Sequence, residues 1–140
     1  MVRISDKKLI KLLMENSRIP FTKLAEELGV TEAAVRKRIK TLEKRGVIRK
    51  FTIDVDPKAL GYKFDVLIGV DTTPETYIKI IDYLKNIDKV IELYTSTGDH
   101  MILIRMWFED TEEMNFFIRS LEEMQGITRV CPAILLEKLK

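Results

Sequence analysis

The sequence predicts an α+β fold in two parts: an N-terminal helix-turn-helix domain of three helices, winged-helix-like, and a C-terminal ferredoxin-like βαββαβ domain. Apolar residues recur at helical spacing in residues 1–50, whereas residues 63–140 alternate between strand and helix patterns. The charge divides in the same way, because residues 1–50 hold 14 Lys or Arg against 6 Asp or Glu, whereas the remainder holds 10 against 16. Residues 51–62 are predicted to form a hinge strand and linker between the domains.

Composition narrows the class of protein. The 140 residues are 46% hydrophobic and 33% charged, which is the balance of a globular chain. The longest stretch without a charged or strongly polar side chain is 130–136, far short of the roughly 20 residues that span a membrane. Residues 1–6 lack the apolar core of a signal peptide, so we expect a soluble, cytoplasmic protein. With Cys131 and His100 each alone of its kind, no metal site, cofactor or catalytic constellation is expected.

Three helices account for the first domain. The first is expected over residues 6–16, with Ser5 positioned to accept hydrogen bonds from its free amides. The second follows Pro20 and ends at Gly29, and Thr31 is expected to cap the third. Their predicted buried residues are Leu9, Ile10, Leu12 and Leu13, then Phe21, Leu24, Ala25 and Leu28, then Val35, Ile39 and Leu42. A glycine-containing turn between two short helices is typical of a helix-turn-helix.

The pattern changes after the third helix. Residues 47–55 are rich in β-branched and aromatic side chains and predict the hinge strand, with Pro57 to Tyr62 as the linker. Beyond it we expect strands at 64–71, 90–96, 101–108 and 127–136, a helix from Thr73 carrying Tyr77, Ile80, Ile81 and Leu84, and a helix carrying Met114, Phe117, Ile118 and Leu121. The strands are apolar on both faces, but two helices cover only one face of such a sheet. The other face is expected to meet a second copy of the chain.

Five motifs follow one another along the chain. They are Ser5–Ile10, Leu24–Thr31, Val35–Ile48, Leu60–Tyr62 and Thr97–His100. Their order and spacing resemble the leucine-responsive regulatory protein / AsnC (Lrp/AsnC) family of bacterial and archaeal transcription regulators. The resemblance covers nearly the whole chain and implies a DNA-binding domain joined by a hinge strand to a small-molecule-binding domain, in dimers that can form tetramers or octamers. The 17 Ile, 15 Lys and only 4 Asn plus Gln suggest an archaeal thermophile.

The third helix carries the residues expected to bind double-stranded DNA. A basic helix of this kind fits the major groove, with its N-terminal residues at base edges. The candidates are Thr31, Glu32, Ala33, Arg36, Lys37, Lys40, Lys44 and Arg45. Arg36 is the candidate for a two-pronged contact with guanine, and Lys40, Lys44 and Arg45 are expected at phosphates. The competing interpretation is a solvated basic face on an amphipathic helix.

A short polar turn lies between two apolar strands of the second domain. It consists of Thr97, Gly98, Asp99 and His100, and Met101 follows it as the first residue of the next strand. A plain turn is sufficient to explain it, since Gly adopts positive φ and Asp bonds local backbone. The resemblance implies, in addition, that this loop helps to hold an amino-acid effector at a boundary between dimers. Asp99 would then bind the ammonium group, amides near Gly98 the carboxylate, and Met101 would select the side chain.

Two other functions compete with DNA-binding regulation. Some proteins that resemble this family decarboxylate sirohaem-type tetrapyrroles and use histidines for it. A single histidine and an intact basic helix argue against such an enzyme. A ligand-binding or oligomerisation module that has lost DNA binding should lack the outward Arg36, Lys37 and Lys40, which this chain keeps. The prediction is therefore a sequence-specific DNA-binding regulator, not an enzyme, modulated by a small molecule such as an amino acid.

Overall fold

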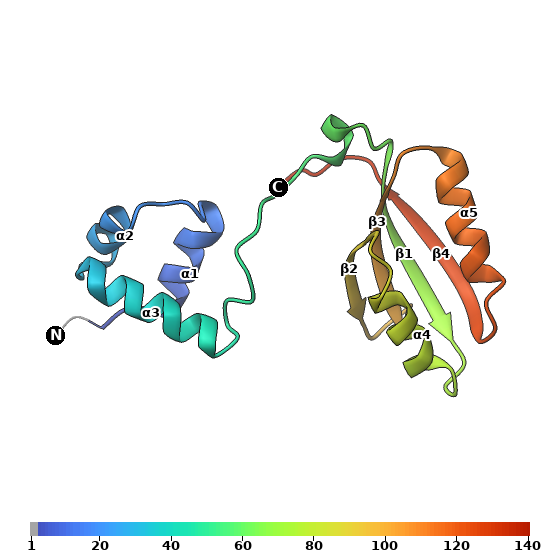
Figure 1. Ribbon diagram of the computed structural model, residues 1–140, viewed down its shortest axis with the longest axis horizontal. Coiled ribbons are helices and arrows are strands. Elements are labelled where there is room, and N and C mark those ends of the chain that lie inside the picture. Colours follow the sequence, from blue (N-terminus) through green and yellow to red (C-terminus); the bar gives the residue numbers. More distant parts are fainter. Residues whose placement is uncertain (1–2) are drawn as a thin grey trace. The chain divides into compact units, whose positions relative to one another are not determined.

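The computed structural model describes residues 3–140 of the chain (Figure 1). The chain divides between Asp54 and Val55 into two compact units, each with its own hydrophobic core. The first unit is helical and the second is built on an antiparallel sheet, which confirms the predicted α+β class. None of the described helices has the length and apolar character needed to cross a bilayer.

The first unit contains the three predicted helices, α1 (Asp6–Glu15), α2 (Phe21–Leu28) and α3 (Glu32–Lys44). The side-chain oxygens of Ser5 and Thr31 accept hydrogen bonds from the backbone amides three residues later, at 3.3 and 3.1 Å. Such caps satisfy amides that have no partner inside the helix, and each stabilises the fold by about 1 kcal/mol. The predicted starts of the first and third helices are confirmed.

The turn between α2 and α3 depends on Gly29. Its φ of 66° lies in the left-handed region, where a side chain would be strained. The turn allows one compact core to form between the three helices. The buried residues of that core are Leu9, Leu13, Leu24, Ala25, Leu28, Val35, Ile39 and Leu42. Burying each larger aliphatic side chain contributes about 1.5–3 kcal/mol, so the core holds the helix-turn-helix geometry.

An ion pair joins the start of α1 to the middle of α3. The Arg38 guanidinium donates two hydrogen bonds to the Asp6 carboxylate, from Nε at 2.6 Å and from Nη2 at 2.5 Å. Arg45 Nη1 lies 4.0 Å from the same carboxylate. The hydrogen bonds from Arg38 lower the pKa of Asp6, because the guanidinium favours the charged carboxylate. Arg38 therefore links two helices, although it lies within a basic run.

The predicted hinge strand is not formed. Residues 49–56, which overlap the expected strand at 47–55, have no regular secondary structure. A strand requires a neighbour for its backbone hydrogen bonds, and no described strand pairs with this segment. Its apolar side chains are also uncovered, since Phe51 is 50% exposed and Ile53 is 78% exposed. The composition of the segment favours a strand, but residues 3–140 of the single chain do not supply the partner that a strand needs.

The second unit follows the predicted βαββαβ order. Its elements are η1 (Pro57–Leu60), β1 (Phe64–Thr72), α4 (Tyr77–Lys85), β2 (Val90–Thr95), β3 (Ile102–Phe108), α5 (Thr111–Glu122) and β4 (Ile127–Leu135). The strands form one antiparallel sheet in the order β2-β3-β1-β4. The main difference from expectation is the start of α4, because Thr73 and Thr76 form a hydrogen-bonded turn before it.

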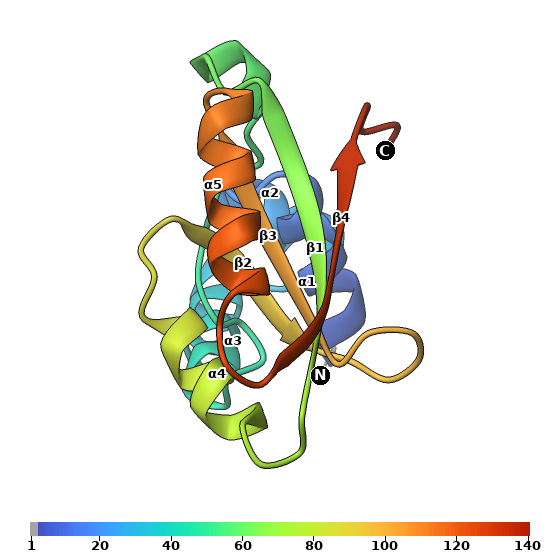
Figure 2. The same cartoon turned by 90° about the vertical axis from the view of Figure 1, so that its right-hand side faces the viewer.

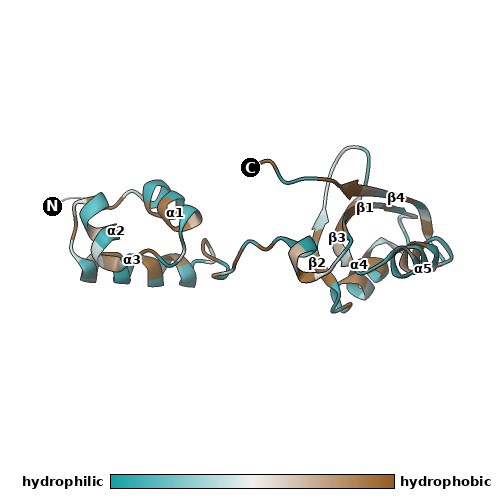
Figure 3. Cartoon of the chain, turned by 90° about the horizontal axis from the view of Figure 1, so that it is seen from above, coloured by the Kyte–Doolittle hydropathy of each residue, from teal (hydrophilic) through white to brown (hydrophobic). Residues whose placement is uncertain are grey.

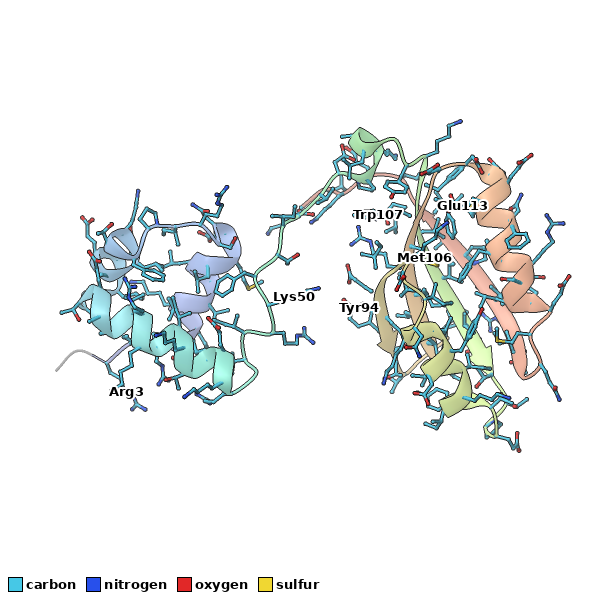
Figure 4. All side chains as sticks on the ribbon, viewed as in Figure 1. Arg3, Lys50, Tyr94, Met106, Trp107 and Glu113 are labelled. Atoms are coloured by element: carbon cyan, nitrogen blue, oxygen red, sulfur yellow. The ribbon has the colours of Figure 1, made fainter. Side chains whose placement is uncertain are left out.

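Both helices of this unit lie on the same side of the sheet (Figure 2). Side chains alternate across β3, so Met106 is buried beneath the helices whereas its neighbour Trp107 faces the other way (both labelled in Figure 4). We call the side without helices the open face. Its residues are Asp65, Leu67, Gly69 and Asp71 of β1, Glu92 and Tyr94 of β2, Leu103, Arg105 and Trp107 of β3, and Arg129, Cys131, Ala133 and Leu135 of β4. Hydropathy colouring shows β1 and β4 as largely hydrophobic (Figure 3).

The ion pair between α1 and α3 predicts a pH-dependent stability. Asp6→Asn should lower the melting temperature of the full chain by a few degrees at pH 7, because Arg38 loses its charged partner. The pKa of Asp6 is lowered by folding, so its contribution is complete above the unfolded value of about 4. The contribution disappears as the pH falls through the lowered pKa. Thermal unfolding followed by circular dichroism between pH 2 and 7 measures this difference.

The matched control is Glu15→Gln, which removes a carboxylate from an exposed position of the same helix. It should leave the melting temperature unchanged at every pH. Equal effects of the two substitutions would show that the Asp6–Arg38 pair contributes nothing beyond net charge.

Candidate functional site

The eight predicted DNA-binding residues all lie on or beside α3, outside the buried core. Lys37, Lys40 and Lys44 recur at spacings of three and four residues, which places them in one row along the helix. We call these three residues the basic row. It lies on the side opposite the buried Val35 and Ile39, and none of the three ammonium groups has a hydrogen bond or ion pair with another described residue. The ammonium groups are thus available to an external polyanion.

Arg36 lies beside the basic row and is held differently. Its guanidinium carbon lies 4.9 Å from the ring centroid of Phe21, the first residue of α2. This is a cation–π contact. No hydrogen bond or ion pair joins the guanidinium of Arg36 to another described residue. The predicted base-contacting residue is therefore exposed and located on the outward side of the helix-turn-helix.

Arg45 is less well placed than the sequence suggested. Its guanidinium points toward the carboxylate of Asp6, 4.0 Å away, on the flank where Arg38 also binds. This flank differs from the side that carries the basic row. The structure therefore brings together most of the predicted DNA-binding residues on one side of α3 and leaves Arg45 on another.

The loop between β2 and β3 is closed by its own hydrogen bonds. The Ser96 amide donates to the Met101 carbonyl at 3.0 Å, and the Ser96 hydroxyl donates to the His100 carbonyl at 2.6 Å. Gly98 has a φ of 99°, as expected for a tight turn. The side chain of Asp99 is exposed and binds Arg129 Nη2 of β4 at 3.1 Å. The turn role predicted for Gly98 is confirmed by this geometry.

Asp71 at the end of β1 fixes this loop to the sheet. Its carboxylate accepts a hydrogen bond from the Met101 amide at 2.9 Å and lies 3.1 Å from Nδ1 of His100. Burial raises the pKa of Asp71, but the hydrogen bonds from His100 and from the Met101 amide outweigh it, so the pKa lies below its ordinary value. Asp71 and Arg129 complete the candidate effector site, although no local motif marks either residue.

The ring of His100 occupies space that a side chain at position 69 would need. A β-carbon on Gly69 would lie 2.3 Å from Cδ2 of the imidazole. Gly69 is therefore required for the close approach of the loop to the open face. Within residues 3–140, no group of three His, Cys, Asp or Glu side chains is arranged to bind a metal ion.

A charged network crosses the centre of the open face. Arg105 donates to both carboxylate oxygens of Asp65, at 3.0 and 2.8 Å, and to Glu92 at 2.9 Å. Tyr94 donates from its hydroxyl to the same Glu92 carboxylate. The hydrogen bonds with Asp65 raise the pKa of Arg105 further above its already high value. Beside the network, the rings of Tyr62 and Trp107 pack with centroids 5.5 Å apart.

Comparisons with known proteins agree with this division of the chain. Residues 3–49 match the family model of winged helix-turn-helix DNA-binding domains, and residues 65–140 match that of the Lrp/AsnC ligand binding domain. The HTH-type transcriptional regulator LrpA of Pyrococcus horikoshii is 45% identical over the full length of both chains. The relatives are named as transcriptional regulators. This supports the predicted DNA-binding regulator over the competing functions, one of which was an enzyme.

Solved structures show the same fold along nearly the whole chain. The crystal structure of PH0061 superposes with a TM-score of 0.86 at 28% identity and covers 100% of this chain and 97% of the other. The structure of AsnC from E. coli superposes with a TM-score of 0.78 at 25% identity and covers 94% and 90%. With two family models that together span most of its length and an archaeal relative that matches from end to end, the chain belongs to the Lrp/AsnC family of transcriptional regulators.

Proposed function

We propose that this regulator reads DNA with α3, acts as a homodimer in the cytoplasm and responds to an amino acid bound near the loop between β2 and β3. The observation that carries the proposal is the exposed basic row on the second helix of a helix-turn-helix. Lysines without internal partners suit phosphates, where each neutralised phosphate releases a counterion. An arginine next to them can donate two hydrogen bonds to one guanine.

The open face supports the proposed homodimer. It combines apolar side chains with a satisfied charged network, and neither helix of the unit covers it. The uncovered hinge segment provides further apolar side chains, Phe51 and Ile53. A second copy offers the same surface, and a two-fold axis lets both open faces be buried at once. Further assembly into tetramers or octamers would build on that dimer.

The effector proposal rests on the paired charges of Asp99 and Arg129. A free amino acid carries an ammonium and a carboxylate, so it can exchange this ion pair for two new ones, ammonium on Asp99 and carboxylate on Arg129. Amides near Gly98 add donors for the carboxylate, and Met101 lies beside them to contact the side chain. Residues 65–140, which match the ligand-binding family model, contain all of these groups.

For DNA, we expect Arg36→Ala to reduce discrimination between a selected site and unrelated sequence by about 1–3 kcal/mol. Lys44→Ala should weaken binding to all sequences equally and reduce the salt slope by about one, because one ammonium no longer neutralises a phosphate. Sites selected from genomic fragments should be roughly palindromic, with half-sites about one helical turn or a multiple apart. Titration of fluorescent duplexes at several salt concentrations measures both the discrimination between sequences and the salt slope. Unchanged affinity and sequence preference in Arg36→Ala would contradict the placement of α3.

For assembly, we expect a dimer that persists at micromolar concentration, measured by light scattering. Leu103→Glu should shift it toward monomer, because the substitution places an uncompensated charge on the open face. Ile78→Glu is the control, since Ile78 is an equally apolar but exposed residue of α4 outside the open face. A stable monomer of the unmodified chain at this concentration would contradict pairing through the sheet.

For the effector, calorimetry against the twenty amino acids should identify at least one that binds at millimolar concentration or below. Asp99→Ala and Arg129→Gln should each abolish the heat of binding, because each removes one of the two charges that the zwitterion needs. Arg119→Gln, a substitution on α5 away from the loop, should leave it unchanged. Absence of binding by all twenty would leave the loop as a plain turn.

A further inference from the structure

Three arginines of this chain, Arg36, Arg38 and Arg105, are held in two different ways. Arg38 and Arg105 donate hydrogen bonds to carboxylates, with both oxygens of Asp6 and of Asp65 engaged. In both arginines the Nε and Nη2 donors are occupied by a carboxylate, and this pair of donors is therefore not available for a bidentate contact with a base. Arg36 instead lies over the ring of Phe21, with its guanidinium carbon 4.9 Å from the centroid.

A ring face attracts a cation without accepting its in-plane N–H groups. The attraction comes from the negative face of the aromatic quadrupole, whereas hydrogen bonds form along the edges of the guanidinium plane. No described residue accepts a hydrogen bond from the five N–H donors of Arg36, so these donors stay available. The contact also restricts a long side chain that would otherwise lose rotamer freedom on binding.

The ring itself is firmly placed. Phe21 begins α2 directly after Pro20 and is half-buried against the core of the first unit. Because α2 and α3 share that core across the Gly29 turn, the distance between the ring and the backbone of Arg36 is fixed by the fold. The guanidinium is thus positioned on the same unit that carries the basic row.

We propose that Phe21 is a positioning residue for sequence discrimination: its ring pre-orients the Arg36 guanidinium for a base edge while leaving every N–H donor free. This inference rests on the proposed base contact by Arg36. It adds a residue that does not touch the bases and acts through Arg36 alone.

The test compares Phe21→Leu, which keeps an apolar side chain but removes the ring, with Phe21→Tyr, which keeps the ring. The measured quantity is the ratio of affinities for a selected site and an unrelated duplex of equal length, at one salt concentration. Phe21→Leu should lower the ratio about two- to fivefold, the value of an exposed cation–π contact. Phe21→Tyr should retain it, and binding to the unrelated duplex should be the same in all variants.

Two further measurements separate positioning from simple destabilisation. In an Arg36→Ala background, Phe21→Leu should lower the ratio no further, since there is no guanidinium to orient. In the free protein, the Arg36 side-chain NMR signals should lose their ring-current shift in Phe21→Leu and keep it in Phe21→Tyr. If Phe21→Leu unfolds the domain, Phe21→Met takes its place, with folding checked by thermal unfolding.

The outcomes distinguish the inference from the proposed function. Loss of discrimination in Arg36→Ala together with full discrimination in Phe21→Leu overturns the role of Phe21 alone. An equal loss from Phe21→Leu with and without Arg36 also overturns it, because Phe21 would then act by another route. No loss in Arg36→Ala overturns the base contact and the inference with it.

Discussion

Two helices can shield only one face of a four-stranded sheet, and the arrangement of residues 55–140 follows from that limit. α4 and α5 lie on the same side of the sheet, so the face beneath the helices and the opposite face differ in the side chains that they carry. The shielded surface carries the apolar buried core of the unit. The open face carries a mixture in which Leu67 and Leu103 accompany a charged network whose members pair with one another. Such a surface is stable when it is exposed to water, and it can also be buried against another apolar surface.

The cationic side chains of the first unit differ in whether they have a carboxylate as a partner, and this difference separates structural cations from exposed ones. Arg38 binds a carboxylate and so contributes to the packing of α1 on α3. The ammonium groups of the basic row have no partner among the described residues, and Arg36 has only an aromatic ring. One helix therefore carries both structural and exposed cations, and the difference lies in whether the Asp6 carboxylate of α1 is within reach of the side chain. Sequence spacing alone does not contain that information, because Asp6 and Arg38 are far apart in the chain.

The predictable parts of the fold are those that depend on local periodicity. The three helices, their caps at Ser5 and Thr31 and the βαββαβ order all follow from spacing within short windows, and the structure agrees. The hinge strand failed as a prediction because composition favours extended backbone but cannot supply a partner strand. The direction of the Arg45 side chain was not predictable, because it points toward the carboxylate of Asp6, which is far away in the sequence. In the loop, the turn itself was predictable, whereas Asp71 and Arg129 reach it only through the register of β1 with β4.

The close approach of His100 to Gly69 ties two positions of the sequence together. The imidazole fills the volume that a β-carbon at position 69 would require, so an imidazole at position 100 excludes a side chain at position 69. Relatives with an imidazole at position 100 are expected to carry glycine at position 69, whereas relatives with a small residue at position 100 are free to carry alanine or serine there. The loop between β2 and β3 and the strand β1 must then change together during evolution. Covariation between positions 69 and 100 would show how closely the loop lies on the sheet.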